Sequence, residues 1–379
     1  MRSQRVRLVL FSTGLALCLF FVLERSFLPG IPPQKPIYKG FDLLGTVTRL
    51  VKDDYIEERN PDQTMEGAYR GLVDSLDPVS SYFGRDVSAK YLKRGAAWAD
   101  VGIVLFKRSF GLFPQVAGLD ENSPAEKAGI KQGDTISAID GRGTLVMSSI
   151  EANLCLKDIE QKPVTLKVVR DNQTLEIKAE RAILHPDPYA LSTGDGFSIL
   201  KIHNLYAPCA ADIRKRALTI IKSRKSPLIL DLRNCAEGEI EEARQVLNLF
   251  IQSGQIGYFE KKGGAKEPLG CPTAPLFPKL PAAVWTNGAT MGPAELIAGV
   301  LQGAYKVKVI GTATPGLVSR QELFPLQDNS SVLITSDVFV LSSGKKLWDE
   351  GVTPDDRVAA EDQSTGAYLK KSAALFPNR

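Results

Sequence analysis

The sequence predicts an α/β domain built on a mostly parallel sheet, together with a small β domain, a short helical segment and an N-terminal membrane anchor. Three patterns lead to this fold class. From about residue 197 onward, apolar strands alternate with helical segments, which is typical of a layered sheet with parallel strands. Residues 100–183 instead show short strands separated by turn residues. The first residues of the chain are rich in arginine, and an apolar run follows them.

The composition is that of a globular protein with more than one domain. Its 379 residues exceed the usual size of one domain, and 44% of them are hydrophobic, which is enough to build a core. The net charge of +4 arises from 47 basic and 43 acidic residues, and it is too small to indicate a nucleic-acid partner. Neither His185 nor His203 lies in an HExxH motif or a Cys/His cluster. We therefore predict no metal site and no cofactor.

The N-terminus has the pattern of an export signal. Three arginines in the first seven residues precede an uncharged run at residues 8–23. No small-x-small cleavage site follows, and Leu17 stands before Cys18, where a lipoprotein signal has a small residue. We predict an uncleaved signal anchor over residues 1–28, with the rest of the chain on the periplasmic or cell-surface side of the membrane. The run is shorter than the ~20 residues that a spanning helix usually needs, so a cleaved signal peptide stays open.

The export prediction raises the question of disulfide bonds. Cys18 lies in the anchor, and the other four cysteines face an oxidising space in which pairing is possible. Their spacing fits neither a disulfide framework nor a metal pattern, so pairing stays open for Cys155, Cys209, Cys235 and Cys271.

Two segments join the anchor to the rest of the chain. Residues 29–37 are rich in proline and predict a stiff linker. Residues 38–97 form the helical segment, in which apolar residues recur at helical spacing from Phe41 to Val51. A second helical pattern begins near Pro61 and ends before Pro78, where a proline forbids continuation.

The β domain is predicted over residues 98–184. One turn of helix is expected at residues 123–129, where Ser123 is the N-cap and Glu126 completes a capping box. A tight Asp-Gly turn is expected to end the third strand. The expected strands are residues 101–105, 115–119, 133–141, 164–170 and 174–179.

The α/β domain is predicted over residues 185–360, followed by a C-terminal tail at residues 361–379. Its strands and helices alternate, so each helix can connect two parallel neighbours. The expected strands are residues 197–202, 227–232, 282–286 and 307–311, and the expected helices are residues 210–222, 239–251 and 293–303.

The string SPAEKAGIKQGDTISAIDG, at residues 123–141, resembles the PDZ domains of bacterial proteases. The resemblance implies that the β domain is an inserted PDZ domain. PDZ domains add a peptide to a sheet edge and hold its C-terminal carboxylate in a nest of backbone N–H groups. Asp100 stands where a second glycine of this loop is usual, and its carboxylate would repel that of a peptide. Peptide binding is expected at Asp100, Val101, Gly102 and Ile103.

Three further motifs resemble the C-terminal-processing (tail-specific) serine peptidases. They are SLDPVSSYF at residues 75–83, PLILDLRN at residues 227–234 and GVTPD at residues 351–355. The likeness extends over roughly residues 38–358. It implies that the α/β domain is peptidase-like and has a sheet of the crotonase-related type.

The residues that would carry peptidase chemistry are replaced. The family nucleophile lies in a stretch similar to residues 287–295, and its position is Gly292. The general base of the family is a lysine, and its position is Leu317, upstream of the retained Gln321. Glycine has no oxygen with which to attack a carbonyl, and leucine cannot accept a proton. Gly292 and Glu295 instead have the pattern of a helix start.

The loop that the resemblance places at the oxyanion is altered as well. The family follows its core strand with Asn-Pro-Gly-Gly, whereas this chain has Cys235, Ala236, Glu237 and Gly238. Glu237 would bring a negative charge toward the oxyanion, which is the wrong sign for stabilising it.

We therefore expect a non-catalytic member of this family that binds peptides or protein C-termini outside the cytoplasm, or that regulates an active protease or another envelope protein. The alternative is an active serine-type endopeptidase that processes C-termini with a displaced nucleophile. Thr290, Ser319 and Cys235 are the hydroxyl and thiol groups that lie near the expected site. A third hypothesis, favoured by Asp100, is a membrane-tethered scaffold that binds no peptide.

Overall fold

The computed structural model describes residues 36–379, except residues 59, 95–97, 218–225, 253, 273–274, 276, 278–280, 360–361 and 377–379. The predicted signal anchor (residues 1–28), its apolar run (residues 8–23) and most of the linker (residues 29–37) lie outside the described residues. Among the helices of the described part, none is long and apolar enough to cross a membrane. The chain divides into two units, residues 1–67 and 68–379.

Two helices confirm the helical pattern near the N-terminus. Helix α2 (Pro36–Asp54) is followed by helix α3 (Pro61–Asp74), whose first seven residues close the first unit. The Thr48 hydroxyl of α2 donates a hydrogen bond to the Leu44 carbonyl at 2.9 Å. The same hydroxyl lies 3.5 Å from the Met65 sulfur of α3. Helix α4 (Arg85–Leu92) belongs to the second unit.

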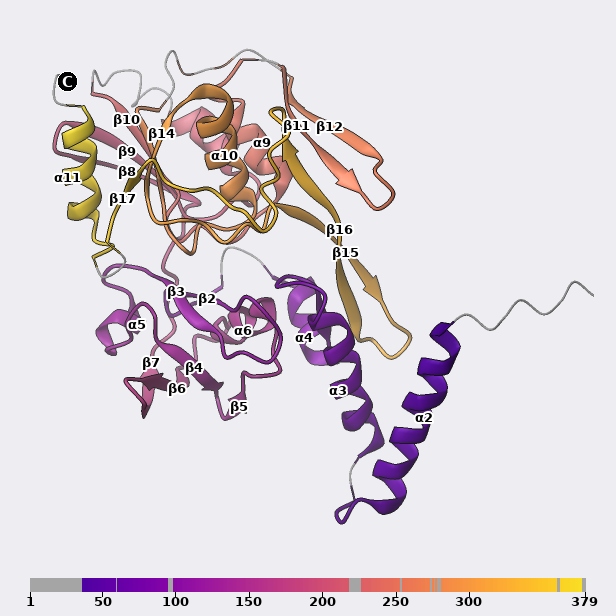
Figure 1. The fold of residues 1–379 in the computed structure, drawn as a ribbon. Helices are drawn as coiled ribbons and strands as arrows, with labels where there is room; N and C mark the ends of the chain where they lie inside the picture. Colours follow the sequence, from indigo (N-terminus) through magenta and orange to yellow (C-terminus); the bar gives the residue numbers. More distant parts are fainter. Residues whose placement is uncertain are drawn as a thin grey trace, which may run out of the picture. The chain divides into compact units, whose positions relative to one another are not determined.

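The β domain is an antiparallel sheet with the strand order β2-β3-β4-β6-β7, and β5 lies beside β4. Its inward side chains form one apolar cluster, which explains the period-two pattern of the sequence. Helices α5 and α6 belong to the same domain, and α6 was not predicted (Figure 1). The bounds are β2 Ile103–Phe106, β3 Gln115–Leu119, α5 Pro124–Lys127, β4 Thr135–Ile139, β5 Arg142–Gly143, α6 Ser149–Leu156, β6 Val164–Arg170 and β7 Gln173–Ala179.

Two details of the β domain differ from the prediction. Strand β2 begins at Ile103 rather than Val101, because the Val101 carbonyl accepts the Ala125 N–H of α5 instead of joining the ladder. Ser123 caps α5 by accepting the Glu126 N–H at 3.2 Å, as expected. In a capping box the Glu126 carboxylate would accept the N–H of Ser123. Here it accepts the Asn122 N–H instead, at 2.5 Å.

The α/β domain contains a six-stranded sheet with the order β17-β14-β13-β10-β9-β8. All of its pairings are parallel except that of β8 with β9, so the predicted mostly parallel sheet is confirmed. Its relation to crotonases stays a prediction. The bounds are β8 Tyr189–Gly194, β9 Phe197–Ile202, α7 Cys209–Asp212, β10 Leu228–Asp231, α9 Ile240–Leu247, β13 Ala283–Thr286, α10 Pro293–Tyr305, β14 Lys308–Gly311 and β17 Asp356–Arg357. Of the helix expected at residues 210–222, the described part is α7 followed by a π-helix, Ile213–Ala217, and residues 218–222 lie outside the described residues.

A second, antiparallel sheet was not predicted. It has the order β1-β16-β11-β12, and β15 pairs with β16. Strand β1 comes from before the β domain and pairs with β16 near the end of the chain, so the β domain is an insertion between them. The bounds are β1 Ser81–Phe83, β11 Gly254–Lys261, β12 Lys266–Cys271, β15 Ser319–Pro325 and β16 Ser331–Leu341.

The segment expected as a C-terminal tail holds helix α11 (Thr365–Leu375), which Ser364 caps. Its Tyr368 is fully buried, and the Tyr368 ring lies 5.3 Å from that of Trp285 on β13. The Trp285 indole N–H donates to Ser372 at 2.9 Å. Burial of these rings attaches the helix to the parallel sheet.

Asp74, at the end of α3, is a buried carboxylate that is not fully satisfied. Its Oδ1 accepts the Tyr82 N–H at 2.9 Å, whereas its Oδ2 is buried without a hydrogen-bond partner among the described residues. Burial raises the pKa of Asp74 from 3.8 to about 6, and the negative charge of Glu151 adds to this rise. The positive charges of Arg70 and Lys107 act to lower the pKa. Because folding favours the protonated form, its contribution to stability is complete below about pH 4 and is lost as the pH rises through about 6.

Replacing Asp74 by asparagine is therefore expected to stabilise the protein in a pH-dependent way. A shift from 3.8 to about 6 corresponds to roughly 3 kcal/mol, which is the upper limit of the gain at about pH 8. A gain of only about 0.5 kcal/mol is expected at about pH 4, where the carboxyl is protonated in the folded state and about half ionised in the unfolded state. Urea titrations at the two pH values measure the difference. Asp86→Asn, at an exposed position, is the control, and an equal gain from Asp74→Asn at both pH values would contradict the argument.

Candidate functional site

Gly292 stands at the N-cap of α10, where the resemblance places the nucleophile. Its φ of +50° and ψ of −110° lie in a region that side chains rarely adopt, which glycine tolerates. The Gly292 N–H donates to the Glu295 carboxylate at 2.9 Å. The predicted helix start is therefore formed, and its backbone geometry does not favour a serine.

Leu317, at the position of the general base, is buried. It packs in an apolar cluster with Ala289 and Met291 and contributes no polar group from its side chain. Its backbone N–H donates to Glu295 at 2.7 Å. The space that the resemblance assigns to a lysine is thus filled by a small core.

Glu295 joins the two altered positions. Its carboxylate is completely buried and accepts four hydrogen bonds, from the N–H groups of Gly292 (2.9 Å), Gly316 (2.6 Å) and Leu317 (2.7 Å) and from the Thr314 hydroxyl (2.5 Å). Burial raises the pKa of Glu295, and the four donors oppose that shift. One side chain thereby fixes the start of α10 and the loop before β15.

Two of the three candidate nucleophiles are enclosed. The Thr290 hydroxyl is fully buried and donates to the Leu232 carbonyl at 2.9 Å. Cys235 is also fully buried, and burial raises the pKa of its thiol well above the usual value. Neither group is placed to attack a substrate.

Ser319 is the candidate that lies at a cavity. Its hydroxyl donates to the Leu317 carbonyl at 3.3 Å and accepts from the Gln321 amide at 2.6 Å. Gln321 therefore orients a hydroxyl rather than a lysine. Neither of these bonds involves an amine that could take the hydroxyl proton.

The Cys235–Gly238 loop is tied to the strand region before α7. The Glu237 carbonyl accepts the Leu205 N–H at 2.9 Å, and Gly238 forms a parallel bridge with Leu205. The Glu237 carboxylate turns toward the β domain and binds the Lys157 ammonium at 2.5 Å. The negative charge predicted near the oxyanion is therefore neutralised by an ion pair.

Lys157, just after α6, binds a second carboxylate, that of Asp100, at 3.5 Å. Burial alone would lower the pKa of Lys157, but Glu237 and Asp100 raise it above the usual value, so the ammonium stays charged. We call Asp100, Lys157 and Glu237 the acidic latch. It connects the β domain to the α/β domain.

The predicted peptide-binding residues lie together at the start of β2. Asp100, Gly102 and Ile103 line the cavity, whereas Val101 is fully buried in the β-domain core. The Asp100 carboxylate accepts the N–H groups of Val101 at 2.6 Å and Gly102 at 3.2 Å. It occupies the N–H nest that the resemblance assigns to a peptide carboxylate.

One cleft of about 450 Å³ runs from this loop to the altered catalytic positions. Trp98 and Phe106 line it from the β domain, and Met291, Gly292 and Leu317 line it from the α/β domain. Apolar and polar side chains both line the cleft, and the polar ones include Asp100, Lys157 and Glu237.

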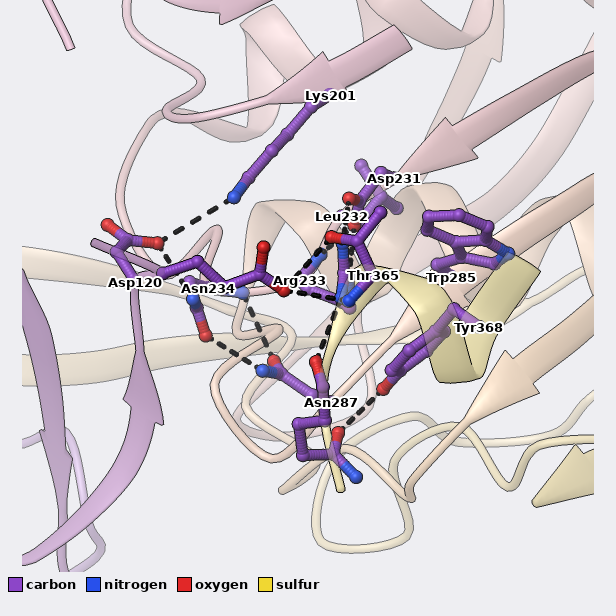
Figure 2. Close-up of polar contacts among 12 residues, drawn as sticks. Asp120, Lys201, Asp231, Leu232, Arg233, Asn234, Trp285, Asn287, Thr365 and Tyr368 are labelled. Carbon is purple, nitrogen blue, oxygen red and sulfur yellow. Dashed lines mark hydrogen bonds and ion pairs between the residues drawn. The ribbon is translucent and has the colours of Figure 1, made fainter. Parts of the chain in front are cut away.

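Asn234, three residues after the end of β10, binds residues of both domains (Figure 2). Its Nδ2 donates to Asp120 of the β domain at 2.8 Å, and its Oδ1 accepts from Asn287 at 2.7 Å. Asp120 also lies 3.7 Å from the Lys201 ammonium, as Figure 2 shows. Gly118 of β3 packs on the same site, where an added Cβ would overlap Asn234.

The two histidines lie beside this contact. The rings of His185 and His203 stack at 3.8 Å, and His185 Nε2 is 2.9 Å from Asp120. Burial and the neighbouring His185 and Lys201 lower the pKa of His203 from 6.5 to about 3, so His203 is neutral. Both histidines thus belong to the domain contact.

Comparison with known families identifies both domains. Residues 102–180 match the family model described as a PDZ domain, and residues 197–358 match the one described as peptidase family S41. This chain belongs to peptidase family S41. The PDZ and S41 domains correspond to the β and α/β domains described above, and the PDZ domain is inserted after β1.

Two curated relatives agree with this assignment. The chain is 27% identical to the carboxy-terminal processing protease CtpA of Bacillus subtilis over 93% of this chain and 76% of that protein. It is 26% identical to the carboxy-terminal-processing protease of Bartonella bacilliformis over 85% of this chain and 76% of that protein. Among solved structures, the photosystem II D1 C-terminal processing protease has a TM-score of 0.68 at 19% identity, over 87% of this chain and 90% of that chain, which shows a common fold.

The residues that connect the PDZ and S41 domains were not predicted from the sequence. Lys157 follows helix α6, and no helix was expected there. The Ser148-x-x-Glu151 capping box would have indicated α6, because Ser148 accepts the Glu151 N–H at 3.0 Å. No local signal pairs Lys157 with Glu237, which lies 80 residues away.

Proposed function

We propose that this S41-family protein does not cleave peptides, and that it acts by binding a peptide or protein in the cleft. The observation that carries the proposal is the replacement of both catalytic groups, by Gly292 at the N-cap of α10 and by Leu317 in a buried apolar cluster. Acyl transfer needs a nucleophile and a base that takes its proton. Neither position supplies one.

The cleft and the PDZ domain support a polypeptide as the ligand. PDZ domains bind C-termini, so a peptide or protein C-terminus is the proposed ligand class. We further propose that the chain is held by an anchor at residues 1–28 and works outside the cytoplasm. There it would bind an envelope protein or regulate an active protease.

A displaced active site is the second candidate, because Ser319 lines the cleft and its hydroxyl accepts a hydrogen bond from Gln321. It would make the chain a working endopeptidase. The two candidates differ in one measurable property, hydrolysis of an unfolded protein.

We expect the full chain, purified in mild detergent, not to hydrolyse unfolded casein above background. Ser319→Ala is the matched variant, and it is expected to leave that background unchanged. Turnover that persists through repurification and disappears in Ser319→Ala would instead establish the displaced site.

The double variant Gly292→Ser/Leu317→Lys is not expected to reach the activity of a complete site. The backbone at position 292 has a φ of +50°, which strains a serine. The oxyanion loop is also altered, and loss of one oxyanion donor alone costs ~2.7–4 kcal/mol of transition-state stabilisation. The same casein assay tests this variant, and full activity in it would show that the altered loop does not matter.

A further inference from the structure

The edge of β2 that faces α6 is occupied by the chain itself. The Leu105 N–H donates to the Asn153 side-chain oxygen at 2.9 Å, and the Asn153 amide donates to the Leu105 carbonyl at 2.7 Å. An added antiparallel strand makes this same pair of bonds with one residue of an edge. The Asn153 side chain therefore takes the place of a peptide unit.

A second contact occurs two residues further along the chain, at Lys107, which directly follows β2. The Lys107 N–H donates to Ser149 Oγ at 3.0 Å, and Ser149 Oγ lies 3.3 Å from the Lys107 carbonyl. A peptide pairs with alternate residues of an edge strand. Leu105 and Lys107 are such alternate positions, so both are taken by side chains of α6.

The third part of a PDZ groove, the carboxylate nest, is also filled. Asp100 places its own carboxylate on the Val101 and Gly102 N–H groups. Lys157 balances this charge and holds Glu237 of the S41 domain with the same ammonium. Asp100 and Glu237 are both replacements of residues that the family resemblance gives as glycine, and one lysine binds them both.

We propose that the PDZ groove is closed by its own side chains and that the acidic latch keeps it closed against the S41 domain. A peptide C-terminus binds only after Asn153 and Ser149 leave the β2 edge and Asp100 leaves the nest. Lys157 then serves as the counter-ion of the peptide carboxylate. The inference rests on the proposed function in one respect, that the ligand is a polypeptide.

Closure of the groove couples peptide binding to the contact between the domains. The Lys157 ammonium that would exchange Asp100 for a peptide carboxylate is the same group that binds Glu237 of the S41 domain. Because such coupling is reciprocal, weakening the Lys157–Glu237 pair alters peptide affinity as well. The affinity of the groove for a peptide thereby depends on the contact between the PDZ domain and the S41 domain.

The test is a titration of the full chain with a fluorescent unstructured decapeptide that ends in valine, with a free or an amidated C-terminus. The variant Asp100→Gly/Asn153→Ala is expected to bind the free peptide roughly ten- to a hundredfold more tightly than the wild type, because two competing contacts are removed. Amidation is expected to abolish the gain, and so is Lys157→Gln added to that variant. Asp171→Gly, in the exposed turn between β6 and β7, is the control for loss of a carboxylate and is expected to bind like the wild type.

Equal affinity of wild type and variant, or a gain that survives amidation, overturns the closed groove. Amide hydrogen exchange provides a test that needs no ligand. The Leu105 amide is expected to exchange slowly in the wild type and much faster in Asn153→Ala, while the Val116 amide of β3 stays protected in both. An unchanged Leu105 rate overturns the inference. Casein hydrolysis would contradict the proposed function alone, because neither readout here depends on cleavage.

Discussion

Replacing Glu295 by alanine is expected to lower the free energy of unfolding by about 4 kcal/mol or more, although the residue touches no substrate. The change leaves four buried donors without their acceptor, and an unsatisfied buried donor costs roughly 1–3 kcal/mol, with partial relief where water enters from the cleft. The donors lie on two separate segments, the start of α10 and the loop from Thr314 to Leu317. Both segments are therefore expected to loosen together.

Urea denaturation of the wild type and the variant measures this loss. Glu322→Ala, at an exposed position on β15, removes the same group where no comparable network exists, and a change within about 0.5 kcal/mol is expected there. A cost below about 1 kcal/mol for Glu295→Ala would mean that water replaces the carboxylate. In that case Glu295 would not be the side chain that fixes the rebuilt site.

A second large effect is expected at the buried ion pair after β10. Arg233 binds Asp231 with two hydrogen bonds, of 2.9 and 2.7 Å, and both side chains are nearly inaccessible. The guanidinium also lies over the rings of Trp285 and Tyr368, at 5.0 and 4.4 Å (Figure 2). Asp231→Ala leaves a buried, unpaired cation, and such a change costs roughly 3–5 kcal/mol. Denaturation by urea is the measurement.

The double variant Asp231→Leu/Arg233→Met is expected to recover part of this loss, because it leaves no buried charge. Lys308→Met breaks the exposed pair with Asp355 and serves as the control, with an expected change below about 1 kcal/mol. If Asp231→Ala were as mild as this control, the pair would be solvated rather than buried.

The pair also predicts a pH dependence. Although burial acts to raise the pKa of Asp231, Arg233 lowers it below the ordinary value of 3.8. Folding then favours the carboxylate, so the stabilisation is present above about pH 4 and is lost as the pH falls through the lowered pKa. This direction is opposite to that of Asp74.

The positions that the family resemblance gives as catalytic are occupied by residues with well-defined contacts. Glu295 caps a helix and fixes a loop, Leu317 fills an apolar cluster, and Glu237 is paired with Lys157. Each of these three residues therefore has a structural partner. A protein that binds and does not cleave is consistent with this arrangement.

The sequence alone predicted the features that depend on local pattern. Alternating apolar residues indicated the strands of the PDZ domain, and apolar runs such as residues 227–232 indicated the buried parallel sheet. Gly292 and Leu317 could be assigned because the motifs around them keep their order and spacing. The strand predictions succeed because strand period is a property of neighbouring residues. The assignment of the nucleophile and base positions to Gly292 and Leu317 stays a prediction.

Only the tertiary structure decided what those residues contact. Asp100 was expected to repel a peptide, and the fold shows that it fills the nest itself and shares Lys157 with Glu237. The strands β11, β12, β15 and β16 were missed, and so was helix α11, although its Tyr368 is fully buried. Contacts between residues far apart in the chain leave no local pattern, because they depend on how separate elements pack and on which charges packing brings within a few ångströms.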